Sequence, residues 1–261
     1  MAVLGAVGLG CSIMLVWASK KFHVDVDPKV ETILELLPGV NCGACGYAGC
    51  AACAENITKG EVPPDVCTSA SFGCIRMIGE VMGISVEEKE KEVAVVLCNG
   101  GVNCTSRFEY DGVEDCKAAM LISDDEKACS YGCIGHGSCV RACPFGAITI
   151  GENRLPIICE NSCKGCGVCV DICPKSILTL GKTSEKVRVL CFSNDKGKYV
   201  REVCKFGCIG CGICVKACPS DAITLKDNLA LIDQEKCTGC GVCVEKCPRD
   251  AIGILGSKDD K

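Results

Sequence analysis

Closely spaced cysteine runs constrain this chain more than any other feature of its sequence. Residues 237–248 read C-T-G-C-G-V-C-V-E-K-C-P, which places four cysteines within eleven residues and a proline after the last, and three related runs precede it. Such crowding is typical either of a secreted disulfide scaffold or of a metal protein in a reducing compartment. Cysteines two residues apart rarely pair with each other, but they can bind one inorganic cluster. The spacing therefore favours the metal protein.

The runs follow the C-x2-C-x2-C-x3-C-P pattern, in which three cysteines hold one four-iron cluster and the fourth binds the neighbouring cluster. The last two runs predict two clusters, one held by Cys208, Cys211, Cys214 and Cys247 and the other by Cys237, Cys240, Cys243 and Cys218. Between these runs, residues 222–233 place two alternating apolar stretches on either side of K-D-N, which predicts a β-hairpin. Strand, turn and strand between two cysteine runs is the order of a bacterial ferredoxin.

The first two runs form a similar module in which one cysteine is missing. A complete site is predicted for Cys163, Cys166, Cys169 and Cys143. The companion site has Cys133, Cys139 and Cys173, and His136 stands where the second cysteine of the run would be. Either His136 binds the cluster, which would raise its potential, or it is an ordinary loop residue and another thiol substitutes or only three irons are bound. Spare cysteines close by favour the second alternative.

A different cysteine group lies near the N-terminus. Asp27-Pro28 and apolar residues at helical spacing predict a short helix that ends at Pro38-Gly39. The motif N-C-G-A-C-G-Y-A-G-C follows directly, and a more distant cysteine completes a set of four: Cys42, Cys45, Cys50 and Cys67. Zinc also suits four thiolates, but the ferredoxin runs in the same chain favour an iron–sulfur cluster here.

The two modules repeat more than their cysteine runs. Each follows a segment that ends in a cysteine, E-K-E-V-A-V-V-L-C in one copy and E-K-V-R-V-L-C in the other, and each has a further cysteine four residues before its first run. The candidates for an extra cluster, or for completing the site at His136, are Cys98, Cys116, Cys129, Cys191 and Cys204. The alternative, thiols without a ligand role, stays open. Cys104 and Cys159 have no counterpart in the repeat and rank lower.

The composition agrees with small domains built around clusters. The 261 residues include 29 cysteines but only 4% aromatic residues, so few large side chains are available to fill a core. Metal centres bonded to several loops can organise small domains instead. The net charge is −5 and no basic stripe is present, which argues against a nucleic-acid partner. We also expect no catalytic residues and no flavin or NAD site, since no G-x-G-x-x-G lies between a strand and a helix and no P-loop occurs.

The N-terminal segment predicts a membrane anchor. Residues 1–19 contain no charged side chain, and Lys20 and Lys21 follow at once. A helix of this length roughly spans the hydrocarbon core, and the lysines mark its cytoplasmic side. We therefore expect a single-pass protein of the cytoplasmic membrane with its cluster domains on the cytoplasmic side. The alternative, a signal peptide, lacks a basic start and a convincing cleavage site.

The expected fold class is α+β, with small iron–sulfur domains. It comprises one N-terminal transmembrane helix, one helical 4Fe-4S domain and two tandem bacterial-ferredoxin-like modules, each with its preceding cysteine-containing segment. The expected bounds are 1–22, 27–85, 92–182 and 186–256. At least five [4Fe-4S] clusters are expected from the cysteine sets.

The sequence resembles the B component of the Rnf complex, the ion-translocating ferredoxin:NAD+ oxidoreductase. The resemblance covers nearly the whole chain and rests on the apolar N-terminal segment, the motif C-G-A-C-G-Y-A-G-C with the distant Cys67, and the tandem ferredoxin modules. It implies a subunit that accepts electrons from reduced ferredoxin and passes them to membrane and peripheral partner subunits. Flavin, NAD and the ion path would then belong to those partners.

Other functions compete with this electron relay. A polyferredoxin serving another membrane or soluble reductase would carry the same runs, and a zinc-rich interaction protein would be colourless and contain no sulfide. Within the electron relay, Lys164, Lys216 and Lys246 lie beside the cysteine runs and are candidates for docking an acidic ferredoxin. Solvated surface charges are the simpler explanation of each lysine.

Overall fold

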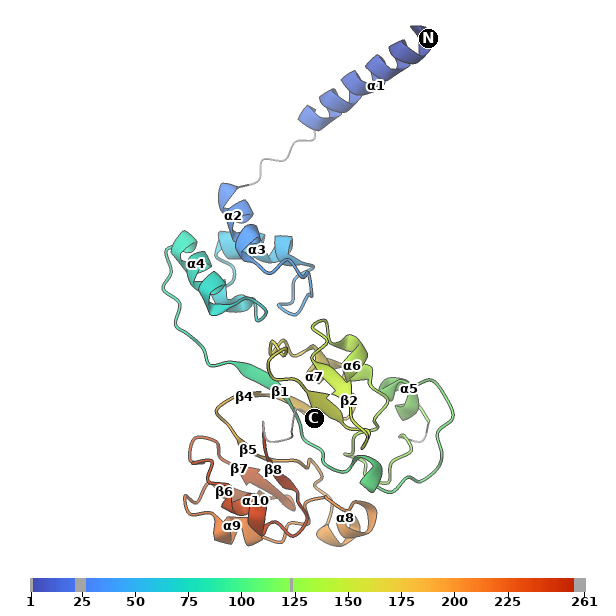
Figure 1. Cartoon of the computed structure of the whole chain (residues 1–261), viewed down its shortest axis with the longest axis vertical. Coiled ribbons are helices and arrows are strands. Elements are labelled where there is room, and N and C mark those ends of the chain that lie inside the picture. Colours follow the sequence, from blue (N-terminus) through green and yellow to red (C-terminus); the bar gives the residue numbers. More distant parts are fainter. Residues whose placement is uncertain (1, 22–26, 123, 256–261) are drawn as a thin grey trace. The chain divides into compact units, whose positions relative to one another are not determined.

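The computed structural model describes residues 2–21, 27–122 and 124–255. The chain divides into two compact units, Met1–Val86 and Glu87–Lys261. The first unit is helical and the second combines short helices with short strands (Figure 1). Residues 1, 22 and 256, which fall at predicted domain bounds, lie outside the described residues.

The first unit begins with α1 (Ala2–Lys21), a helix of 20 residues. The predicted transmembrane anchor, and with it the expected location in the cytoplasmic membrane, is wrong: among the described residues, no helix combines the length and the apolar character needed to cross a bilayer. Gly5, Gly8 and Gly10 contribute no apolar side chain, and the Ser12 hydroxyl donates to the Gly8 carbonyl oxygen at 2.9 Å.

Three further helices complete the first unit: α2 (Pro28–Leu36), α3 (Cys50–Lys59) and α4 (Phe72–Met82), with a 3-10 turn, η1 (Pro64–Val66). The predicted N-cap of α2 is present, since the Asp27 carboxylate accepts the Lys29 N–H at 2.9 Å. The helices bury a small apolar core made of Ile33, Leu37, Ala54, Ile57 and Ile78. The cysteine loop that precedes α3 packs against this core.

The described strands of the second unit form four two-stranded antiparallel sheets. In the first copy of the repeat, β1 (Glu92–Val96) pairs with β4 (Leu178–Lys182), and β2 (Ile148–Ile150) pairs with β3 (Pro156–Ile158). In the second copy, β5 (Val187–Val189) pairs with β8 (Ile252–Ile254), and β6 (Ile223–Lys226) pairs with β7 (Leu229–Ile232). Each module is therefore closed by a pair formed from its leading and its final strand. The hairpin predicted within residues 222–233 is confirmed as β6–β7.

Each cysteine run continues into a helix of five residues: α6 (Ser138–Ala142), α7 (Val168–Ile172), α9 (Ile213–Ala217) and α10 (Val242–Lys246). The residue before each helix is a glycine with positive φ, a conformation that side chains with a Cβ rarely adopt. The third cysteine of the run is the second residue of the helix, and the fourth follows its last residue. These short helices thus bring the cysteines of each run close together.

Three additional elements lie in the segments that precede the runs: η2 (Gly101–Asn103), α5 (Cys116–Met120) and α8 (Gly197–Val203). Main-chain hydrogen bonds join these segments across the two copies of the repeat. The Thr105 N–H donates to the Val203 carbonyl at 2.8 Å, and the Lys205 N–H donates to the Asn103 carbonyl at 3.1 Å. The two copies therefore belong to one compact unit, and its finer division into 92–182 and 186–256 stays a prediction.

Candidate metal centres

The four predicted N-terminal ligands surround one cavity of the first unit. It is lined by Cys42, Cys45, Cys50 and Cys67, and also by the buried Cys53 of α3. The Cys50 N–H donates to Asn41 Oδ1 at 2.8 Å, which fixes the start of α3. Gly49 has φ +127°, and a Cβ there would lie 2.8 Å from Asn41 Oδ1. A glycine is therefore required for the loop to close around the cavity.

The complete sites of the two modules bring together the cysteines that their spacing predicts. One cavity is lined by Cys143, Cys163, Cys166 and Cys169, and another by Cys208, Cys211, Cys214 and Cys247. The remaining set gathers around Cys243: burial raises the pKa of its thiol, and nearby thiols raise it further, namely those of Cys237, Cys218 and Cys240. In each of these three sets, the fourth cysteine of one run thus lies with the first three cysteines of the neighbouring run.

Backbone N–H groups point at several of these sulfurs. Ala94 N–H donates to Cys163 Sγ and Ala147 N–H to Cys143 Sγ, both at 3.4 Å. In the second module, Ala251 N–H donates to Cys247 Sγ at 3.3 Å. Hydrogen bonds to ligand sulfurs, together with burial, are the means by which a protein sets the potential of an iron–sulfur cluster.

The site with the missing run cysteine has a fourth thiol from another element. Its cavity is lined by Cys116, Cys133, Cys139 and Cys173. Cys116 is the first residue of α5 and stands outside the cysteine runs. The spacing therefore predicts three of these thiols. The fourth, Cys116, is one of the extra cysteines of the repeat segments. The sequence leaves open whether these complete this site or build a further cluster. In the structure, Cys116 lines the cavity of this site.

Asp115 and Ser138 hold Cys116 in place. The Asp115 carboxylate caps α5, accepting the N–H groups of Lys117 at 2.9 Å and Ala118 at 3.1 Å. It also accepts the Ser138 hydroxyl at 2.8 Å, while the Cys116 N–H donates to that hydroxyl oxygen at the same distance. The Ser138 hydroxyl and the other donors lower the pKa of Asp115 to about 2. The ionised carboxylate therefore ties α5 to α6, which carries Cys139.

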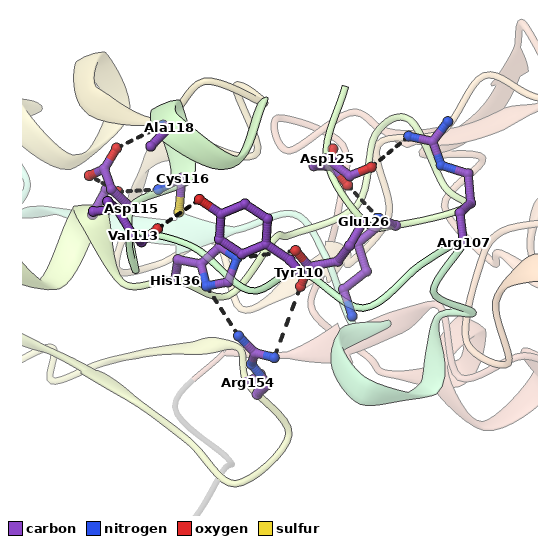
Figure 2. A network of polar contacts seen from close by, with 12 residues as sticks. Arg107, Tyr110, Val113, Asp115, Cys116, Ala118, Asp125, Glu126, His136 and Arg154 are labelled. Carbon is purple, nitrogen blue, oxygen red and sulfur yellow. Dashed lines mark hydrogen bonds and ion pairs between the residues drawn. The ribbon is translucent and has the colours of Figure 1, made fainter. Parts of the chain in front are cut away.

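His136 has other partners than a metal. Its Nε2 lies 3.1 Å from Glu126 Oε2, and its Nδ1 lies 3.2 Å from an Arg154 guanidinium nitrogen. Tyr110 packs on the imidazole with ring centroids 5.0 Å apart. Figure 2 shows the ring between Tyr110 and Arg154, with both nitrogens in polar contacts. The geometry favours the alternative in which His136 organises its loop and a thiol substitutes.

Another cavity of the second unit lies where the two copies of the repeat meet. Five thiols line it: Cys98, Cys104, Cys129, Cys191 and Cys204. Four of these are candidates from the repeat, whereas Cys104 ranks lower in the sequence because it has no repeat counterpart. No spacing rule could have placed Cys104 here, since its position depends on the bridge that pairs it with Cys204. Cys159, the other lower-ranked thiol, is exposed.

Burial keeps many of these thiols protonated in the metal-free protein. It raises the pKa values of Cys139, Cys191 and Cys214 to about 11, and that of Cys169 to about 12. Iron binds the thiolate, so cluster assembly at these sites displaces protons. Within the described residues, no three or more histidine, cysteine, aspartate or glutamate side chains are arranged to hold a single metal ion. A four-iron cluster places its thiolates on different irons and needs a wider arrangement.

Family models match the same regions of the chain. One described as "Putative Fe-S cluster" matches residues 37–69. Models described as "4Fe-4S dicluster domain" match residues 132–178, 162–223 and 207–251. The cysteine sets that line the cavities fit [4Fe-4S] clusters, and several such clusters are the cofactors of this chain.

Named relatives match almost the whole chain. The B component of the ion-translocating oxidoreductase complex of Methanosarcina acetivorans is 49% identical over 90% of this chain and 90% of that protein. The B component of the proton-translocating ferredoxin:NAD(+) oxidoreductase complex of Clostridium ljungdahlii is 43% identical over 90% of this chain and 83% of that protein. The corresponding component of the Na(+)-translocating complex of Acetobacterium woodii is 45% identical, with 90% and 71% covered. The chain therefore belongs to the family of the B component of the Rnf complex, the ion-translocating ferredoxin:NAD+ oxidoreductases.

Proposed function

We propose that this subunit receives electrons from reduced ferredoxin and relays them to partner subunits of an ion-translocating oxidoreductase complex. The gathering of cysteines into separate sets of at least four thiols supports this proposal most directly. A [4Fe-4S] cluster accepts and releases one electron without making or breaking a substrate bond. The names of two relatives, which include ferredoxin and NAD+, support the choice of donor and complex.

We assign five clusters to the cysteine sets. The first unit would use Cys42, Cys45, Cys50 and Cys67. The first module would use Cys116, Cys133, Cys139 and Cys173 for one cluster and Cys143, Cys163, Cys166 and Cys169 for the other. The second module would use Cys208, Cys211, Cys214 and Cys247 for one, and Cys218, Cys237, Cys240 and Cys243 for the other. The cavities and the electrostatic grouping support these sets.

The chain's own residues would position the clusters and set their potentials. Short helices hold the third cysteine of each run, and N–H donors such as those of Ala94, Ala147 and Ala251 face ligand sulfurs. A donated hydrogen bond stabilises negative charge on sulfur and so favours the reduced cluster. Different numbers of donors and different burial would therefore give the clusters different potentials.

Three lysines beside the clusters are the proposed contact for an acidic ferredoxin. Lys164, Lys216 and Lys246 are all exposed. Opposite charges on two surfaces speed encounter, and the effect weakens as salt is added. Replacing all three lysines by glutamate should slow reduction of the full chain by reduced ferredoxin at low salt, by about tenfold or more. An unchanged rate at low salt would remove these lysines from the docking surface.

The decisive experiment combines composition with electron transfer. Anaerobically purified full chain should contain iron and acid-labile sulfide in equal amounts, and reduced ferredoxin should bleach its visible absorption in a stopped-flow experiment. A colourless protein that carries zinc and no sulfide would contradict the whole proposal. An iron–sulfur protein that strong chemical reductants bleach but ferredoxin does not would contradict ferredoxin as the donor.

A further inference from the structure

The five thiols at the junction of the two repeat copies surround a cavity at least as large as those of the predicted cluster sites. Its volume, including space open to solvent, is about 400 Å³. The cavities lined by the run cysteines measure about 320, 350 and 380 Å³ on the same basis. Tyr131, Phe192 and Phe206 also line the junction cavity, in a chain with few aromatic residues. The space and the thiols thus resemble those of a cluster site.

Two of these thiols occupy equivalent positions in the two copies. The residue before each, Leu97 or Leu190, donates its N–H to a carbonyl of the closing segment at 2.7 Å, so each cysteine follows a paired strand. Cys98 Sγ then accepts the Cys133 N–H at 3.5 Å, and Cys191 Sγ accepts the Cys208 N–H at 3.3 Å. These are the same kind of N–H donors that face the run cysteines.

The other two equivalent thiols, Cys129 and Cys204, complete the arrangement. Gly100 lies between sulfurs of different copies: a Cβ on it would be 3.1 Å from Cys204 Sγ and 3.8 Å from Cys98 Sγ. The Tyr199 hydroxyl donates to the Ala128 carbonyl at 2.7 Å, which joins the segments that carry Cys129 and Cys204. Two thiols from each copy are therefore held around one space.

We propose that Cys98, Cys129, Cys191 and Cys204 bind a further [4Fe-4S] cluster, so that each copy of the repeat supplies two ligands. The Cys104 thiol packs in one buried cluster with those of Cys129 and Cys204. Cys104 has no equivalent in the other copy, and it lines the site without binding iron. The function of the repeat is then to build a metal site that neither copy could complete alone.

The position of this site suits it to pass electrons between the two modules. This role rests on the electron relay proposed above. Its ligands Cys98 and Cys191 accept N–H groups of Cys133 and Cys208, which are the first cysteines of the two modules. The site thus lies next to one cluster site of each module. One electron passes from the reduced site of one module to this site and then to the other module, with no proton or bond change. The junction connects the two modules.

Metal content of the full chain tests the site directly. Six four-iron clusters give about 24 irons and about 24 sulfides per chain, whereas five give about 20 of each. Replacing both Cys98 and Cys191 by alanine should lower each count by about four and remove one one-electron signal from a redox titration followed by electron paramagnetic resonance. Cys104→Ala is the matched control, since it removes a thiol from the same cavity and should keep about 24 irons.

Several outcomes would overturn the proposal. About 20 irons in the unaltered protein would do so, as would an unchanged count in the double variant. Loss of about four irons from Cys104→Ala, with none from the double variant, would refute the ligand set. If the double variant loses all its iron and its circular dichroism signal, it has failed to fold. The number of clusters is then decided on the unaltered protein, from its iron count and from its mass by native mass spectrometry. A protein with about 24 irons that ferredoxin cannot reduce would contradict the proposed donor and support the site.

Discussion

Cys116 is the residue whose assignment depends most on three-dimensional structure. It lines a cavity with three run cysteines and is held by the Asp115 and Ser138 contacts. Replacing Cys116 by alanine should cost about four irons per chain, or about one if the remaining three cysteines retain a three-iron cluster. Iron analysis and the paramagnetic signal of an oxidised three-iron cluster distinguish these results. Cys159→Ala, which removes an exposed thiol, is the control and should keep the parental iron content.

His136 gives the complementary prediction. Replacing His136 by alanine should leave the iron content unchanged, because both ring nitrogens already contact Glu126 and Arg154. The Glu126 side chain is only 5% exposed, so the variant leaves a buried carboxylate without its imidazole partner. We expect a loss of about 1–3 kcal/mol in the stability of the surrounding segment, measured by hydrogen exchange of residues 107–127. Loss of iron from this variant, with none from Cys116→Ala, would make His136 the ligand.

At the scale of single residues, the sequence predicts those metal ligands that lie close together in the chain. The C-x2-C-x2-C pattern predicts three thiols of each complete site, because a tight turn brings them together whatever the rest of the chain does. The pattern does not predict the positions of Cys116 and Cys104, because contacts with residues distant in sequence determine where each of them lies. The repeat predicts Cys98 and Cys191 as a pair, but not that they share a cavity.

At the scale of elements, the cysteine runs offer a matched pair of glycines. Gly210 and Gly239 stand before the second cysteine of their runs, with φ +64° and +71°. A Cβ at Gly210 would lie 2.8 Å from the Asn228 carbonyl oxygen in the β6–β7 turn, whereas at Gly239 no atom lies within 4 Å. Gly239→Ala should cost only the left-handed penalty of about 1–2 kcal/mol. Gly210→Ala should cost more and release about four irons from its site.

Hydrogen exchange of the β6–β7 hairpin and the iron content measure this difference, because a chain with several clusters does not unfold in two states. In Gly210→Ala the hairpin should exchange faster, and in Gly239→Ala it should exchange at the parental rate. Equal iron content and equal exchange in both variants would show that Asn228 moves aside without cost.

Elements differ in how well the sequence predicts them. The β6–β7 hairpin follows from alternation on either side of the K-D-N turn, and the positive φ values of Asp227 and Asn228 are those of a tight turn. The pairing of β1 with β4 and of β5 with β8 could not be predicted, since the partners lie far apart in sequence and the strands are three to five residues long. For the N-terminus, the absence of charge predicts a membrane span, which the described helices do not contain.

For the whole molecule, the metal centres and the fold depend on each other. Small aliphatic residues pack around the cysteines of each module, and the buried set around Cys214 and Cys243 is typical: Val187, Ile223, Ala230 and Ile252. With few large side chains, each module gains much of its order from the bonds between its loops and its metal clusters. Composition therefore predicts the class of protein more reliably than it predicts the arrangement of the modules.

This dependence gives a pH prediction for the whole chain. Burial raises the pKa values of Cys139, Cys191 and Cys214 to about 11, so these thiols are protonated in the metal-free protein at neutral pH and unprotonated on iron. Each displaced proton favours the iron-bound form by about 1.4 kcal/mol for every unit by which the pH rises, up to the raised pKa values. Iron retention should therefore be lower at pH 6.5 than at pH 8.5. An anaerobic titration with free iron and sulfide activities fixed at both pH values measures this. Equal retention at both would mean that the thiols lose their protons before iron binds.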